Sequence, residues 1–149
     1  MADSDLIKLY SGRILELAAN IPRTHRLPSP DASVRKRSPL CGSTVTVDIN
    51  MSGEKVTAYG QEVKACALGQ AAASVVGDVI VGSTRDQIVT ARDQLKKMLK
   101  EGGPVPKAPF QNLEVLKPAA EFKNRHASIL LTLEAAVEAM EQASKAASA

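Results

Sequence analysis

The sequence has few aromatic residues and no tryptophan. Only 3% of its 149 residues are Phe, Trp or Tyr, so small and aliphatic side chains must fill any core. An aromatic platform on which single-stranded nucleic acid could stack is therefore not expected. The formal net charge of +3 is too small to indicate DNA or RNA on its own. We therefore predict no nucleic-acid partner.

Long apolar runs and a targeting signal are also absent from the sequence. No stretch approaches the roughly 20 apolar residues that span a bilayer, and the chain opens with an acidic segment, Met1 to Asp5, instead of a basic one. These absences predict a cytoplasmic protein with no membrane partner. Because cytosolic thiols stay reduced, a structural disulfide between the two cysteines is not expected.

Hydrophobic periodicity divides the chain into a helix, a group of strands and then further helices. The length suits a single domain over residues 1–149. The predicted segments are a helix over 4–20, a proline-containing loop over 22–39, strands over 40–65, helices over 66–100, a proline-containing insertion over 104–121 and a helix over 124–144. This order predicts an α+β fold, with a small antiparallel sheet of about three strands packed against four to five helices.

Two local patterns give finer predictions. Gly60 lies inside the return strand, from about Val56 to Lys64, and is predicted to form a β-bulge. The segment Ser83-Thr84-Arg85-Asp86 resembles a capping box with Asp in place of the preferred Glu, which predicts the start of a helix.

Basic residues gather in two places before the first predicted strand of the sheet. They are Arg23, His25 and Arg26 in one group and Arg35, Lys36 and Arg37 in the other. One interpretation is a solvated loop, and the other is a docking patch for an acidic protein partner.

The two cysteines are placed where two thiols can meet. Cys41 precedes the first predicted strand, and Cys66 joins the return strand to the next helix. Because the start of one hairpin strand lies beside the end of the other, both thiols can reach one edge of the sheet. A helix N-terminus at Cys66 would favour its thiolate. There is no C-x-x-C pair of a local zinc knuckle, and the competing interpretation is two buried structural cysteines.

Three other side chains are weaker candidates. His126, at the start of the last predicted helix, is either a capping or surface residue or a third metal ligand. Ser43 and Ser128 are poor metal ligands and by themselves are typical of caps or strand ends. The sequence has no Gly-rich phosphate loop, no paired carboxylates and no Ser/His/Asp signature, so we do not expect an enzyme.

An ordered set of segments resembles the NifU N-terminal/IscU/SufU family of iron–sulfur cluster assembly scaffolds. The set covers about residues 5–140. It comprises Leu9-Tyr10 with Ile14-Leu15, Asn20-Ile21-Pro22-Arg23, Ser38-Pro39-Leu40-Cys41-Gly42, Val63-Lys64-Ala65-Cys66-Ala67-Leu68, Gly82-Ser83-Thr84, and Phe110 to Phe122 followed by Arg125. The piece from Phe110 to Phe122 resembles the insertion that marks the SufU branch.

The resemblance implies a metal pocket with four ligands, which are three cysteines and an aspartate. This sequence keeps two of the four. Cys41 and Cys66 match two of the cysteines. Ser43 occupies the position of the aspartate, and Ser128 occupies the position of the third cysteine. A shift of a residue or two would let His126 take that third place. Two thiolates and His126 supply three of the four donors that iron or zinc prefers, whereas two subunits could together supply four cysteines.

The resemblance also implies a function. The chain would be a scaffold or carrier that binds iron or a [2Fe–2S] cluster, as a monomer or homodimer, and passes it to recipient apo-proteins, with a cysteine desulfurase as a second partner. Two alternatives remain. One is a zinc-binding acceptor of persulfide sulfur, and the other is an interaction module that keeps the scaffold fold without its metal.

Overall fold

A computed structural model describes residues 12–39 and 42–148 of the chain, without the side chains of 147 and 148. The described residues form one antiparallel sheet of order β1-β2-β3, four α-helices and two 3₁₀ helices. Their bounds are α2 Gly12–Ala19, β1 Ala32–Arg37, β2 Thr44–Ser52, β3 Lys55–Lys64, α3 Ala67–Val79, α4 Arg85–Glu101, η1 Gln111–Glu121, η2 Lys123–Arg125 and α5 His126–Ser148. The predicted α+β fold is confirmed.

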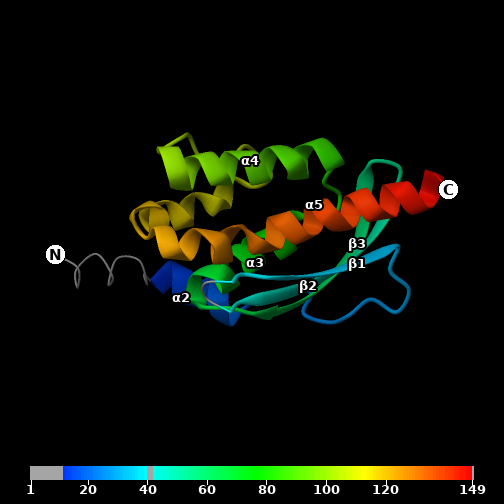
Figure 1. Cartoon of the computed structure of the whole chain (residues 1–149), viewed down its shortest axis with the longest axis horizontal. Coiled ribbons are helices and arrows are strands. Elements are labelled where there is room, and N and C mark those ends of the chain that lie inside the picture. Colours follow the sequence, from blue (N-terminus) through cyan, green and yellow to red (C-terminus); the bar gives the residue numbers. More distant parts are fainter. Residues whose placement is uncertain (1–11, 40–41, 149) are drawn as a thin grey trace.

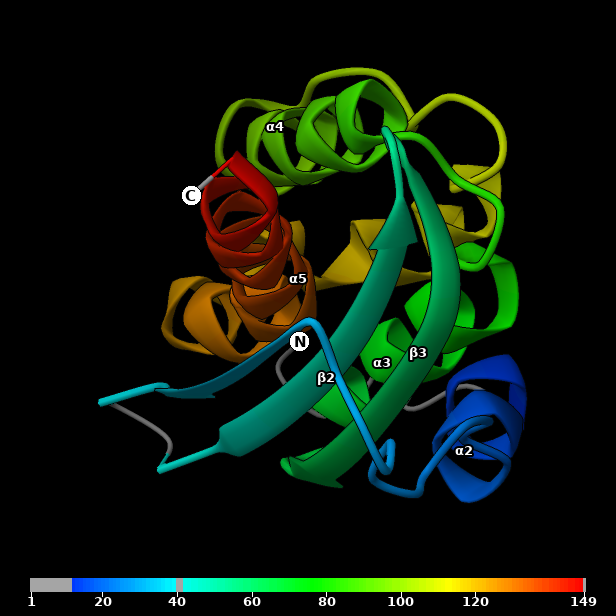
Figure 2. The same cartoon turned by 90° about the vertical axis from the view of Figure 1, so that its right-hand side faces the viewer.

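The helices cover one face of the sheet (Figures 1 and 2). Alternate residues of β2, Val45, Val47 and Ile49, are buried because they point toward α5. A run of small residues forms α3, where Ala71, Ala72 and their neighbours are buried. Only part of the predicted helix over 4–20 falls in the described residues, as α2. Within the part of the chain that the structure describes, no helix is both long and apolar enough to cross a membrane.

The prediction of a loop over the whole of 22–39 is wrong, because Ala32–Arg37 forms the edge strand β1. This strand pairs antiparallel with β2, from Ala32 opposite Ile49 to Arg37 opposite Thr44. Its buried inward residues, Ala32 and Val34, are small and few, and its exposed outward residues include the basic Arg35 and Arg37. The apolar alternation was therefore too short to indicate a strand.

The β-bulge predicted at Gly60 also needs correction. The register shift in the sheet lies between Asn50 and Met51, and not at Gly60. A side chain at Gly60 would collide with the carbonyl of His25, so this glycine instead lets the loop after α2 lie flat on β3.

The capping box of α4 is present one residue later than predicted. Thr84 is the N-cap and exchanges hydrogen bonds with Gln87, through contacts of 2.9 and 3.2 Å. Ser83 instead donates its hydroxyl to the Val79 carbonyl.

The loop after α2 is fixed to the outer face of the sheet by Asp48. This carboxylate is fully buried and accepts hydrogen bonds from Arg26 at 2.7 Å, from the Ser33 hydroxyl at 2.6 Å and from the Leu27 N–H at 2.9 Å. Burial raises the pKa of Asp48. The hydrogen bonds and the charge of Arg26 lower it by a larger amount, so the pKa of Asp48 lies below the ordinary value of an aspartate. A buried charge with partners of this kind holds the loop in one place.

Candidate functional site

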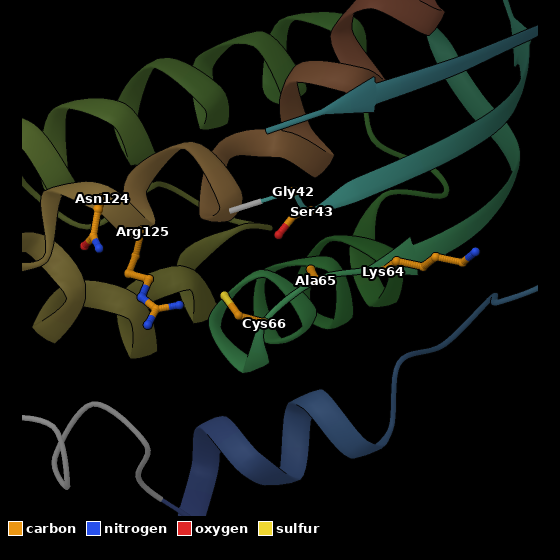
Figure 3. Close-up of a pocket in the computed structure, with 7 residues that line it drawn as sticks. All are labelled: Gly42, Ser43, Lys64, Ala65, Cys66, Asn124 and Arg125. Carbon is orange, nitrogen blue, oxygen red and sulfur yellow. The ribbon is translucent and has the colours of Figure 1, made fainter. Parts of the chain in front are cut away.

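A hollow of about 360 Å³ opens at the end of the sheet where β3 passes into α3 (Figure 3). Three segments far apart in the sequence build it. The residues that line it are Gly42, Ser43, Lys64, Ala65, Cys66, Asn124 and Arg125. The predicted juxtaposition of the start of β2 with the end of β3 therefore occurs, because these strands pair from Thr44 opposite Lys64.

Cys66 is the N-cap residue of α3, with an extended backbone conformation. Its thiol is half-buried and faces the hollow. Burial raises the pKa of Cys66. The backbone N–H of Gly69, the Ser128 hydroxyl, the N–H of Leu68 and the charge of Arg125 lower it by more, so the net pKa is below the ordinary value for a thiol. The first turn of α3 thus stabilises the thiolate, which is the form that binds metals and attacks sulfur.

Ser43, Ser128 and Cys66 form a short chain of polar contacts. The Ser43 and Ser128 hydroxyl oxygens are 3.0 Å apart, and the Ser128 oxygen is 3.6 Å from the Cys66 sulfur. Metal–ligand bonds of about 2.0–2.3 Å place neighbouring atoms of a tetrahedral site roughly 3.3–3.8 Å apart. The three side chains therefore lie close to ligand spacing, but two of them carry neutral hydroxyls.

A glycine brings Ser128 to this position. A side chain at Gly69 would come within 2.6 Å of the Ser128 oxygen and 2.9 Å of the Ala65 Cβ, so only glycine allows α5 this close to the start of α3. Gly69 was missed in the sequence, where its only signal was a glycine inside a run of small residues. Arg125 was also missed as a contributor to the charge at Cys66, although it follows the resemblance motif.

His126 is buried and does not belong to the side chains that line the hollow. Its Nε2 lies 3.2 Å from the Ala119 carbonyl oxygen and 3.0 Å from that of Ala120. A ring nitrogen between two carbonyl oxygens must carry the proton and donate. Nε2 is therefore engaged with the end of η1, while Nδ1 is buried without a hydrogen-bond partner among the described residues.

Cys41 lies outside the described residues, so its predicted meeting with Cys66 stays a prediction. The residues that follow it, Gly42 and Ser43, both line the hollow. Ser38 and Ser43 close the loop between them, since the Ser38 N–H donates to the Ser43 carbonyl at 2.8 Å and the Gly42 N–H donates to the Ser38 carbonyl at 2.9 Å.

Comparison with solved structures decides the family. The crystal structure of a nitrogen-fixing NifU-like protein (N-terminal) from Brucella abortus is 43% identical to this chain, with a TM-score of 0.92, and covers 95% of this chain and 98% of that one. The chain belongs to the NifU/IscU/SufU family. No family model and no curated protein sequence matches this NifU-like chain.

Two more distant structures share the NifU-like fold. One is a proposed iron–sulfur cluster assembly scaffold protein for the SUF system from Fervidobacterium islandicum, which is 19% identical with a TM-score of 0.78 and covers 88% of this chain and 96% of that one. The other is a hypothetical protein, 18% identical with a TM-score of 0.80, covering 89% and 97%. At these identities they support the fold alone.

Proposed function

We propose that this NifU-like chain is an iron–sulfur scaffold or carrier that holds iron or a nascent [2Fe–2S] cluster through Cys66 and Cys41. It then passes this cargo to recipient apo-proteins. The observation that carries the proposal is the Cys66 thiol, which faces an open hollow with a lowered pKa at the start of α3. Membership of the NifU-like family supports the same function.

The donor count makes this a site for labile cargo. The chain has two cysteines, whereas a [2Fe–2S] cluster takes about four ligands. Ser43 and Ser128 already share a hydrogen bond, and neutral hydroxyls are weak ligands. One copy therefore holds cargo loosely, and two copies that contribute two thiols each complete the ligand set. An incomplete set suits a carrier, because the cargo must leave.

Sulfur transfer is the second candidate, and the environment of Cys66 favours it. The Cys66 thiolate would attack the outer sulfur of a persulfide on a cysteine desulfurase. A new S–S bond forms on Cys66, the S–S bond on the desulfurase breaks, and the desulfurase cysteine leaves as a thiolate, with no net oxidation. The N–H groups of Leu68 and Gly69 that lower the pKa of Cys66 would hold the sulfur anion.

Iron and acid-labile sulfide bound after anaerobic reconstitution test the first candidate. We would compare the wild-type chain with a Cys41→Ala/Cys66→Ala variant, using Ser83→Ala as a control because Ser83 is a buried serine bonded elsewhere. Iron and sulfide in the wild type and the control, but not in the double variant, are expected. Equal content in all three would overturn the proposal.

The double cysteine variant, together with substitutions of Arg35, Lys36 and Arg37, separates the second candidate from the interaction module. Labelled sulfur on Cys66 after incubation with a desulfurase, without bound iron, would favour the sulfur acceptor. The interaction module would be favoured by a different pattern. The chain would keep its function when both cysteines are substituted, and would lose it when Arg35, Lys36 and Arg37 are substituted.

A further inference from the structure

The outer face of the sheet carries a cluster of basic side chains at the end nearest Cys66. Two rows of paired residues cross the sheet here, one containing Arg37, Thr44 and Lys64 and the next containing Arg35, Thr46 and Glu62. Their side chains point away from the helices, since the alternate residues Val34, Val45 and Val47 are buried on the other face. None of the helices that the structure describes covers these rows, as Figure 2 shows.

The three cations of these rows, Arg35, Arg37 and Lys64, have no acidic partner in the part of the chain that the structure describes. Glu62 lies 3.6 Å from Arg26, which also binds the buried Asp48. The neighbouring Lys36 points to the helical side and contacts Glu138 of α5 at 3.0 Å. Arg35, Arg37 and Lys64 therefore remain as an unbalanced group, which we call the basic face.

The spacing of the basic face makes the imbalance costly. Arg35 and Arg37 are two residues apart on one strand, or about 6.7 Å, and Arg37 and Lys64 are two strands apart, or about 9.6 Å. The separation of Arg35 and Arg37 lies within the Debye length of about 8 Å at physiological salt, and the longer one lies within the roughly 10 Å found at 0.1 M salt, so the charges repel one another. Folding gains nothing from this arrangement, whereas an anionic partner would.

The basic face is continuous with the thiol site. A groove of about 380 Å³ runs over the rows and is lined by Arg26, Ser33, Arg35, Thr44, Thr46, Glu62 and Lys64. Lys64 lines this groove and the Cys66 hollow as well, and in Figure 3 its ammonium group extends away from Cys66. A partner seated in the groove would therefore contact Lys64, two residues before Cys66.

We propose that the basic face docks an extended acidic segment of a partner protein, with carboxylates at alternate positions. Side chains two residues apart on an extended segment repeat at about 6.7 Å, which matches Arg35 and Arg37. Each guanidinium pairs with a carboxylate through two parallel hydrogen bonds. Thr44 and Thr46, which lie between the cations in the groove, have short side chains that leave room for the backbone of the bound segment. The rows carry no aromatic side chain for stacking bases, which disfavours a nucleic acid.

Binding of a labelled peptide to the full chain tests this inference. The probe is a peptide of alternating Glu and Thr, followed by fluorescence anisotropy at low and physiological salt, beside the same peptide with Gln for Glu and an oligothymidylate of equal charge. The variant is Arg35→Glu/Arg37→Glu/Lys64→Glu. The matched control is Lys96→Glu/Lys100→Glu/Lys117→Glu, which reverses three exposed lysines of α4 and η1.

We expect the reversal on the basic face to weaken binding of the Glu peptide roughly tenfold or more, because exposed ion pairs each contribute up to about 1 kcal/mol. The control variant should bind within about twofold of the wild type. Equal losses in both variants would overturn the proposal, as would tighter binding of the oligothymidylate or no binding of the Glu peptide. The inference goes beyond the proposed function and fails separately from it, since none of these variants removes a thiol.

Discussion

At position 128 a hydroxyl occupies a place suited to a metal ligand. Its oxygen lies 3.6 Å from the Cys66 sulfur and 3.0 Å from the Ser43 oxygen, with all three atoms at one end of the sheet. Replacing oxygen by sulfur here changes the donor and leaves the backbone where it is. A cysteine at position 128 would therefore place a second sulfur beside that of Cys66, whereas the serine hydroxyl is a weak donor.

Ser128→Cys should raise the affinity for Zn²⁺ on the order of a hundredfold, because each thiolate supplies a share of the 10–16 kcal/mol of a full structural site. Cobalt titration would follow this through the thiolate-to-metal absorption. The control is Ser83→Cys, which adds a thiol at a buried serine outside the hollow. Equal affinity in the two variants would mean that Ser128 does not point at the metal.

The charge environment of Cys66 predicts a pH dependence. Because its pKa is lowered, alkylation of Cys66 in a Cys41→Ala background should continue to lower pH than alkylation of a free thiol. Ser128→Ala removes one of the groups that lower the pKa, so the midpoint should move to higher pH. An unchanged midpoint in Ser128→Ala would show that the hydroxyl does not donate to the sulfur.

At the scale of elements, the site depends on the contact between α3 and α5. Gly69 gives α3 a smooth surface where Ser128 of α5 approaches, and the absence of a side chain sets the distance between the helices. The same helices contact the inner face of the sheet. The end of the sheet and the two helix starts therefore form one packed unit.

Gly69→Ala should lower the free energy of unfolding by about 1–3 kcal/mol through overpacking, despite a helix-propensity gain of nearly 1 kcal/mol. Urea unfolding measures this. Gly12→Ala is the matched control, since Gly12 lies in α2 and no atom of the described residues comes within 4 Å of the added carbon. A stabilised Gly69→Ala variant would mean that α3 and α5 can separate at little cost.

At the scale of the whole molecule, the proposed function links the cargo to the number of subunits through the number of thiols. One chain supplies two cysteines, and the cationic residues Lys64 and Arg125 line the hollow. Two such faces would repel each other in the absence of cargo. A cluster with four thiolates is negatively charged, so it would both complete the ligand set and screen this repulsion.

The chain should therefore be a monomer without cargo and a dimer when loaded with [2Fe–2S]. Anaerobic size-exclusion chromatography with light scattering would measure both masses. Addition of a chelator should return the dimer to a monomer, whereas Cys66→Ala should remain monomeric throughout. A loaded monomer with a full cluster would show that donors other than the four cysteines complete the site.

The sequence by itself determined the fold class, the family and the order of elements apart from the strand Ala32–Arg37. Alternation at residues 44–51, the helical periods and the order of the motif segments depend on local pattern, which a single sequence displays. It also placed Cys66 at a helix start, because a strand and a small-residue helix meet there.

Only the tertiary structure decided which polar groups meet. The contact of Ser128 with Ser43 and Cys66 depends on Gly69, and the turn of His126 toward η1 depends on the carbonyls of Ala119 and Ala120. The strand Ala32–Arg37 was equally hidden, because half of its residues are basic and its stability comes from pairing with β2. Each of these arrangements depends on contacts between residues distant in the chain, and such contacts leave no local period in a single sequence.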